Sequence, residues 1–128
     1  MSSVAVVSGS CLCKAVKLTF TEGLKNPPGL IYCHCIQCQK FTGVYGALNP
    51  FDWSTLNIEG EENLSWFQEE GKLPMRGFCK KCGSSLLQRR EDGTHALVFG
   101  GAIDTKDVFK PSTLHVNKEE AGQHYMLD

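Results

Sequence analysis

Seven cysteines in a chain of 128 residues constrain this sequence more than any other feature. They fall into three tight groups, and none stands alone: Cys11 and Cys13; Cys33, Cys35 and Cys38; Cys79 and Cys82. The count is odd, and the sequence opens without a basic segment followed by a long apolar run, which argues against a secreted disulfide scaffold. Clustered thiols in a reducing compartment are typical of metal sites, so we expect a cytoplasmic metal-binding protein.

Two of the groups together suit a closed metal site. Cys79-Lys80-Lys81-Cys82-Gly83 is a zinc-knuckle pattern, in which two cysteines three apart turn toward one ion and the glycine permits the turn. Cys11 and Cys13 are two residues apart, and in an extended chain such residues point to the same side. The two pairs supply four thiolates, the ligand set of a tetrahedral structural zinc that would connect the N-terminal strand to a distant turn.

The third group predicts a different kind of site. Cys33, Cys35 and Cys38 supply three thiolates within six residues. Three protein ligands leave a fourth position for water or substrate, which is the arrangement of catalytic zinc sites. We therefore expect two zinc ions per chain, one in a closed site and one in an open site.

Three other interpretations stay open at this point. In a zinc ribbon, Cys35 and Cys38 would join Cys79 and Cys82, which leaves three thiols without a role. An iron–sulfur cluster would take four of the seven. His34 could complete the open site, although between two ligands of an extended segment it is expected to face outward or into the core. The remaining histidines have no partner at ligand spacing, so structural or exposed places are expected for His95, His115 and His124.

The rest of the chain predicts one mainly β domain over residues 1–128. With 41% hydrophobic residues, a chain of this length can bury a single core. Short runs of β-forming residues, separated by turn signals, are expected to be strands: Ala15–Phe20, Leu30–Cys33, Val44–Leu48, Leu64–Phe67, Ser85–Gln88 and Ala96–Phe99. The best helix candidate is Gln37–Thr42, ended by Gly43, and a second helical turn is expected near Thr105.

Charge and hydropathy argue against several classes of protein. Thirteen Lys and Arg against fourteen Asp and Glu give a net charge of −1, which provides no general attraction to nucleic acid or anionic membranes. The longest apolar stretch, Ala96–Ile103, is far shorter than the ~20 residues that span a bilayer. The charges are uneven locally, acidic over 59–70 and basic over 72–90. Solvated edges explain this pattern, and the basic stretch is also a candidate site for an anionic small molecule.

The three cysteine groups and their flanking residues resemble the glutathione-dependent formaldehyde-activating enzyme family, also called the CENP-V/GFA domain. The resemblance covers nearly the whole chain and implies a small, zinc-stapled, β-tent-like domain with one or two short helical turns. It rests on Gly-Ser-Cys11-x-Cys13, Cys33-His-Cys35-x-x-Cys38-x-Lys40-x-Thr42-Gly43, Arg76-x-Phe78-Cys79-x-x-Cys82-Gly83-Ser84, Gly100–Asp104 and Pro111-x-x-x-His115.

The resemblance also implies a chemistry. The family's founding activity joins formaldehyde to glutathione to give S-hydroxymethylglutathione, which is carbon–sulfur lyase chemistry. The implied structural zinc ligands are Cys11, Cys13, Cys79 and Cys82, and the implied catalytic zinc ligands are Cys33, Cys35 and Cys38, with the thiol substrate in the fourth position. Glutathione carries carboxylates, and the candidates to hold them are Arg76, Lys40 and Lys81.

The sequence departs from the family pattern at a few points. Gln39 stands where Arg is frequent, Ser85 stands where Pro is frequent, and the chain is shorter than the enzymes that gave the family its name. Fold and metals therefore carry over better than the formaldehyde substrate does. Two other functions stay open: a non-catalytic zinc module that binds a protein or, against the evidence of the net charge, a nucleic acid; and a redox or metal buffer with labile thiols.

Overall fold

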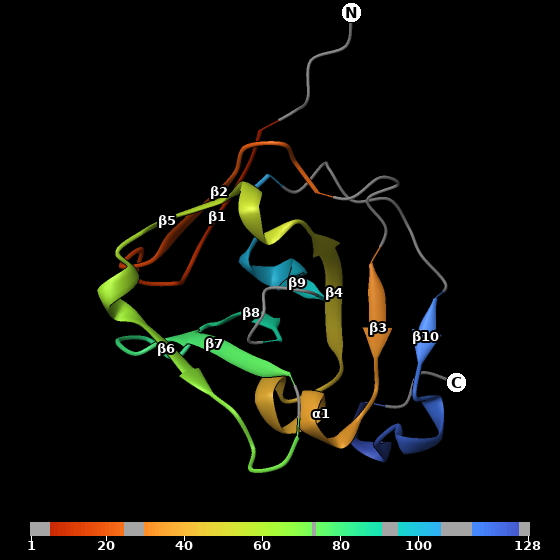
Figure 1. The fold of residues 1–128 in the computed structure, drawn as a ribbon. Helices are drawn as coiled ribbons and strands as arrows, with labels where there is room; N and C mark the ends of the chain where they lie inside the picture. Colours follow the sequence, from red (N-terminus) through yellow and green to blue (C-terminus); the bar gives the residue numbers. More distant parts are fainter. Residues whose placement is uncertain (1–5, 25–29, 73, 91–94, 106–113, 126–128) are drawn as a thin grey trace, which may run out of the picture.

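The computed structural model describes residues 6–24, 30–72, 74–90, 95–105 and 114–125, and this part of the chain is mainly β (Figure 1). Its strands are β1 (Val7–Ser10), β2 (Lys17–Phe20), β3 (Ile31–Cys33), β4 (Gly46–Phe51), β5 (Leu56–Glu59), β6 (Leu64–Phe67), β7 (Met75–Cys79), β8 (Ser85–Arg89), β9 (Ala96–Phe99) and β10 (His115–Val116). One α-helix, α1 (Ile36–Thr42), lies in the described part, and short 3-10 turns are η1 (Trp53–Thr55), η2 (Glu61–Asn63), η3 (Gly100–Ala102), η5 (Lys118–Glu120) and η6 (Gln123–Tyr125).

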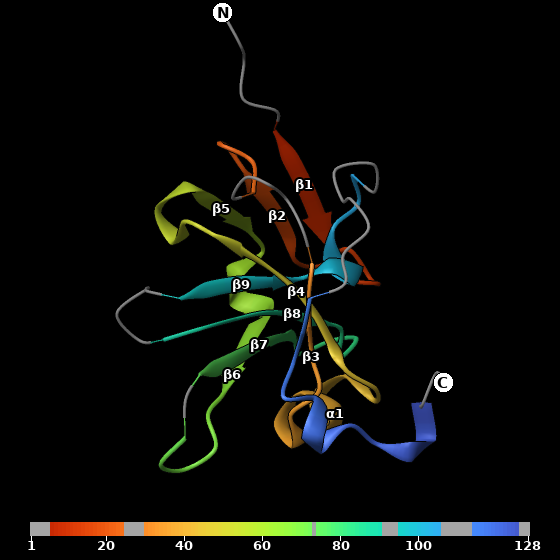
Figure 2. The same cartoon turned by 90° about the vertical axis from the view of Figure 1, so that its right-hand side faces the viewer.

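The strands form two sheets. The smaller has the order β1-β2-β5 and the larger the order β10-β3-β4-β9-β8-β7-β6. The pairings are antiparallel, apart from the parallel pair of β10 with β3. Figures 1 and 2 show the smaller sheet at one end of the molecule and α1, beside the C-terminal 3-10 turns, at the other. No helix in the described residues is long and apolar enough to cross a membrane.

The main core lies where the two sheets meet. Strand β2 alternates as the sequence predicts, because Leu18 and Phe20 are buried while Lys17 is exposed and Thr19 is partly exposed. Phe20 packs edge-on against Phe51 of the larger sheet, with 4.9 Å between ring centroids. Burial of each such side chain contributes roughly 1.5–3 kcal/mol to the free energy of unfolding. An isolated bridge also connects Gly9 of β1 to Ile103, which follows η3.

A second, smaller core positions the three-cysteine group. Cys38, Leu48 and Phe99 are buried together, and the residues packed against them are Cys33, Cys35, Phe41 and Leu97. The group therefore lies against apolar side chains of β4 and β9 and is held away from the main core. Apolar surroundings exclude water from sulfur ligands and strengthen the electrostatic interactions among them.

The predicted mainly β class is confirmed, and each predicted strand overlaps an observed one. The helix is also confirmed, with Gly43 at its C-cap. Four strands were missed because their sequences lack alternation or contain unfavourable residues: β1, β5, β7 and β10. In β7, for example, Arg76 and Gly77 interrupt the pattern, and the structure has a register shift between Gly77 and Phe78. The turn expected near Thr105 falls mainly on 106–113, outside the described residues.

Gly60 offers a test of this packing. It begins η2 with φ at 82°, and a Cβ at this position would overlap the carbonyl oxygen of Ala15. Gly60→Ala is expected to reduce the free energy of unfolding by roughly 2–5 kcal/mol, because left-handed strain and a backbone clash add together. The matched control is Gly71→Ala, since Gly71 has φ at 74° with no atom within 4 Å of its Cβ position. Urea unfolding in excess zinc measures the free energy of unfolding of both variants. Equal losses of stability in the two variants would show that the contact with Ala15 does not matter.

Candidate metal centre

Four sulfurs converge where the end of β1 meets the end of β7. Cys11 and Cys13 follow β1, Cys79 ends β7, and Cys82 lies in the turn after it. The four sulfurs lie within 4.8 Å of one another, with 3.7 Å from Cys11 to Cys13 and 3.8 Å from Cys13 to Cys79. Four sulfurs held tetrahedrally about 2.3 Å from one zinc ion lie about 3.8 Å apart. We call these residues the four-cysteine cluster, and they can hold a metal ion.

The local backbone turns these sulfurs inward. The amide of Gly83 donates to the carbonyl of Cys79 (2.7 Å), and Gly83 adopts φ of 79°, the left-handed region that glycine enters without strain. The hydroxyl of Ser84 accepts from the amide of Leu12 (2.9 Å) and lies 3.2 Å from the sulfur of Cys82. Ser84 therefore connects the two halves of the cluster, and sequence spacing alone had given it no role.

The other three sulfurs lie where β3 leads into α1. Cys33 ends β3, Cys35 is the N-cap of α1, and Cys38 is in the first turn of the helix. Their sulfurs lie within 4.8 Å of one another, so this three-cysteine cluster can also hold a metal ion. The structure thus groups the seven thiols four and three, and it does not bring Cys35 and Cys38 together with the Cys79 pair as a zinc ribbon would.

Each sulfur of the three-cysteine cluster accepts a hydrogen bond from a group that is not itself a ligand. The side-chain amide of Asn117 donates to Cys33 (3.4 Å), the backbone amide of Cys38 donates to Cys35 (3.4 Å), and the guanidinium of Arg76 donates to Cys38 (3.6 Å). Such donors stabilise thiolate charge and orient metal ligands. Sequence reasoning had not assigned Asn117 any function, since it lies far along the chain in the tail.

Hydrogen bonds among the thiols separate their pKa values. The bond from Cys38 lowers the pKa of Cys33 to about 5, against the opposing effect of partial burial, and Asn117 adds to the lowering. The same bond, together with burial, raises the pKa of Cys38, and the Arg76 guanidinium acts in the opposite direction. In the four-cysteine cluster, the hydrogen bond with Ser84 lowers the pKa of Cys82 to about 5. Each cluster therefore contains a sulfur poised as the thiolate, the form that binds metals.

His34 lies outside the sulfur cluster, as its place between two ligands predicted. Its ring is buried and bonds to the hydroxyl of Tyr125 (2.7 Å) through Nδ1 and to His115 Nδ1 (2.8 Å) through Nε2. Burial and then the nearby His115 lower the pKa of His34. The three rings stack, with 5.1 Å between the histidine centroids. The contacts of His34 with His115 and Tyr125 thus connect the segment of the three-cysteine cluster to the C-terminal segment.

The two departures from the family pattern each form a contact in the structure. Gln39 donates from Nε2 to the carbonyls of His34 (2.8 Å) and Glu120 (2.7 Å), which fixes the C-terminal segment against α1. The hydroxyl of Ser85 donates to the carbonyl of Phe41 at the other end of the helix (3.1 Å). Proline at position 85 has no side-chain donor to make this bond.

The basic stretch over 72–90 does not form one surface. Arg76 is buried beside the three-cysteine cluster, and the Arg89 guanidinium lies between Trp53 and Trp66, 4.1 Å and 5.1 Å from the ring centroids. Lys81 is exposed in the turn of the four-cysteine cluster. Of the three cations expected to hold glutathione, Arg76 and Lys40 line one cavity, and Lys81 does not.

Comparison with known proteins gives a consistent result. The family profile described as "Glutathione-dependent formaldehyde-activating enzyme" matches residues 6–119. A curated protein of Halomonas elongata, named "Putative glutathione-dependent formaldehyde-activating enzyme", is 31% identical over an alignment of 123 residues that covers 89% of this chain and 76% of that protein. A crystal structure of a Rhodobacter sphaeroides protein aligns with a TM-score of 0.57 and 26% identity, over 72% of this chain and 82% of that one. This chain belongs to the glutathione-dependent formaldehyde-activating enzyme family.

Proposed function

We propose that residues 1–128 form a single two-zinc domain that acts in the cytoplasm as a carbon–sulfur lyase on the glutathione adduct of a small aldehyde such as formaldehyde. The observation that supports this most strongly is the three-cysteine cluster, in which three sulfurs converge and each accepts one hydrogen bond from a non-ligand donor. Soft thiolate ligands suit zinc, and all seven cysteines of the chain are free thiols, as a reducing compartment requires.

The two clusters take different roles in this proposal. The structural zinc ligands are Cys11, Cys13, Cys79 and Cys82, and the catalytic zinc ligands are Cys33, Cys35 and Cys38. When bound at the second set, zinc supplies a Lewis acid that lowers the pKa of a substrate thiol and polarises a carbonyl oxygen. Around it, Asn117, Arg76 and the amide of Cys38 hold the three sulfurs in place, and Phe41 and Phe99 pack beside the buried Cys38.

The proposed reaction forms one carbon–sulfur bond. The sulfur of glutathione attacks the aldehyde carbon, and the thiol proton passes to the aldehyde oxygen, which gives S-hydroxymethylglutathione from formaldehyde. No oxidant or reductant takes part. The printed names of the family and of the Halomonas relative support this substrate pair. A non-catalytic zinc module would instead have no position at which a thiol could exchange.

Cobalt replacement tests the proposal directly. Cobalt(II) in the three-cysteine cluster is expected to change its visible absorption when glutathione is added, because a fourth sulfur enters the coordination shell. Exchange NMR on the zinc protein is expected to show formaldehyde and glutathione interconverting with their adduct faster than in buffer alone. An absorption spectrum that no thiol alters, together with an exchange rate equal to that in buffer alone, would contradict the proposed enzymatic function. The non-catalytic zinc module would then be the favoured interpretation.

A further inference from the structure

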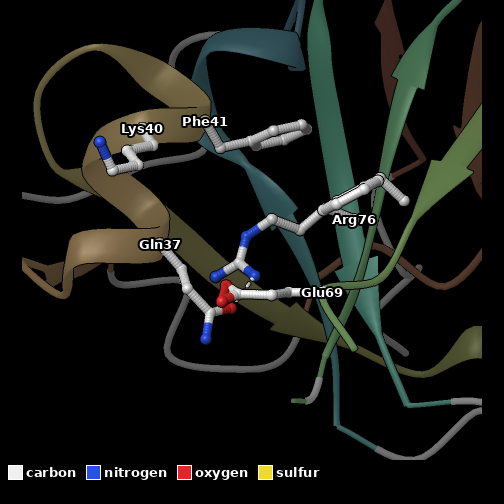
Figure 3. Close-up of a pocket in the computed structure, with 6 residues that line it drawn as sticks. Gln37, Lys40, Phe41, Glu69 and Arg76 are labelled. Carbon is white, nitrogen blue, oxygen red and sulfur yellow. Dashed lines mark hydrogen bonds between the residues drawn. The ribbon is translucent and has the colours of Figure 1, made fainter. Parts of the chain in front are cut away.

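A cavity of about 250 Å³ lies between α1 and the β6–β7 hairpin. Figure 3 draws its six lining side chains and labels five of them, with Arg76 reaching from β7 toward Gln37 on α1. The full lining is Gln37, Lys40, Phe41, Phe67, Glu69 and Arg76. The volume is just below the roughly 300–1,000 Å³ of pockets that hold drug-sized ligands, so it suits one end of a small peptide.

Arg76 connects this cavity to the three-cysteine cluster. Its guanidinium donates to Oε1 of Gln37 (2.5 Å) and to the sulfur of Cys38 (3.6 Å), while Arg76 as a whole is only 7% exposed. Its Nε has no hydrogen-bond partner among the described residues, and no carboxylate in that part of the chain lies within ion-pair distance of it. A buried guanidinium with unused donors favours a carboxylate ligand, which it can bind through two parallel bonds.

The cavity also offers an opposite charge and an apolar wall. Glu69, two residues after the end of β6, lines it and is half exposed, with its carboxylate 3.1 Å from Lys72. Phe41 and Phe67 add two rings, of which Phe67 is 61% exposed. In Figure 3 the ammonium of Lys40 points away from Arg76, so Lys40 contributes at the rim. A cation and an anion flanked by phenyl rings match the zwitterionic end of an amino acid with a short hydrocarbon chain.

We propose that this cavity binds the α-amino-acid end of the peptide thiol substrate, with its carboxylate on Arg76, its ammonium on Glu69 and its methylenes between Phe41 and Phe67. The γ-glutamyl arm of glutathione carries this end. The inference rests on the proposed function, since it presumes that the thiol binds at the three-cysteine cluster. The arm is a single residue joined through its side-chain carboxyl, so when extended it spans nearly as much as two ordinary residues, roughly 7 Å from the cysteine, given the ~3.8 Å between successive Cα atoms. That reach matches a guanidinium that contacts both the cavity and Cys38.

The affinities of three thiols separate the contribution of the cavity to binding from that of the metal site. Glutathione has the full amino-acid end, glutaryl-cysteinylglycine lacks only its ammonium, and 2-mercaptoethanol lacks the peptide. Dissociation constants come from titration of the cobalt-substituted protein, and KM and kcat come from exchange NMR on the zinc protein. We expect tightest binding for glutathione and weakest for 2-mercaptoethanol.

Glu69→Gln is the first variant, because Glu69 is at the surface and its replacement is not expected to affect folding. It is expected to weaken glutathione binding about threefold, as loss of one partly exposed ion pair does, and to leave kcat and glutaryl-cysteinylglycine binding unchanged. The matched control is Glu70→Gln, because Glu70 is exposed and does not line the cavity. Equal effects of Glu69→Gln on both peptide thiols would overturn the assignment of Glu69.

Arg76→Lys tests the carboxylate site. The variant keeps the charge but loses the planar fork, so glutathione binding is expected to weaken about tenfold more than 2-mercaptoethanol binding, which reports the effect of the altered Cys38 contact on the metal site alone. If both thiols weaken equally, Arg76 acts only on the metal site and the cavity proposal fails. If glutathione and 2-mercaptoethanol bind the unmodified protein equally well, the cavity proposal fails while the open site stands. If neither glutathione nor 2-mercaptoethanol changes the absorption spectrum of the cobalt-substituted protein, the proposed function itself fails.

A binding measurement without the thiol completes the test. S-Methylglutathione has the amino-acid end but no thiol that can become a thiolate. In the zinc protein it is expected to shift the side-chain amide NMR signals of Gln37, which bonds to Arg76 at the cavity wall. Unshifted signals at saturating concentration would overturn the proposal.

Discussion

Cys79→Ser is expected to leave the chain unfolded even in excess zinc. Cys79 is completely buried at the end of β7, where it joins this strand to the residues that follow β1. The binding free energy of a structural zinc is roughly 10–16 kcal/mol in small zinc domains, and a domain of this size is stable by only about 5–15 kcal/mol. Loss of one ligand in four therefore removes a large part of the stability, and the substitution also buries a hydroxyl in place of a sulfur.

Circular dichroism and native mass spectrometry on protein purified with zinc check this prediction. The expected results are a spectrum without the β signal and a chain that carries no zinc. Cys11→Ser is expected to behave in the same way, since Cys11 is equally buried in the same cluster. A Cys79→Ser protein that folds, with two zinc ions bound and a Tm within a few degrees of the unmodified chain, would show that the four-cysteine cluster is not structural.

Cys35→Ser is expected to give the opposite outcome, a folded protein with one zinc ion fewer. Cys35 is the N-cap of α1, and its side chain accepts from the amide of Cys38. Serine is among the preferred N-cap residues, so the helix keeps this bond and the loss of stability is expected to be smaller than the roughly 0.5–2 kcal/mol that removal of a cap costs. The open site loses one of three ligands, so the variant is expected to bind no glutathione and to leave the exchange rate at that of buffer.

Native mass spectrometry with and without glutathione separates the possible results. One zinc per chain, a native circular dichroism spectrum and no glutathione adduct are expected. An unfolded Cys35→Ser protein that resembles Cys79→Ser would contradict the division into structural and catalytic sites. Two zinc ions with glutathione still bound would show that Cys35 is not a ligand.

The sequence predicted the local features of this protein well because they depend on short-range chemistry. The strand at Ala96–Phe99 and the buried positions of β2 follow from residue type and a period of two. The helix after Cys35 follows from the glycine at position 43, which closes it in the left-handed conformation. The grouping of the thiols follows from spacing and ligand count, which favour four and three, and the structure brings them together in that way.

The strands that the sequence missed depend on partners that lie elsewhere in the chain. β10 has two residues and exists because it pairs with β3, and β1 is a run of small residues that pairs with β2. Without its partner strand, neither segment is expected to hold an extended conformation, because isolated strands are not stable in water. The role of Ser84 depends in the same way on Leu12, which the fold brings beside it.

The sequence by itself determined the fold class, the helix and the division of the cysteines into a group of four and a group of three, because residue type, spacing and the count of thiols decide them over a few positions. Only the tertiary structure decided what surrounds the three-cysteine cluster. Asn117 and Arg76 approach its sulfurs from β10's end and from β7, and Arg76 also lines a cavity with Glu69. These contacts join segments far apart in the chain, and the packing of β strands and α1 sets their distances, which no local pattern in the sequence encodes.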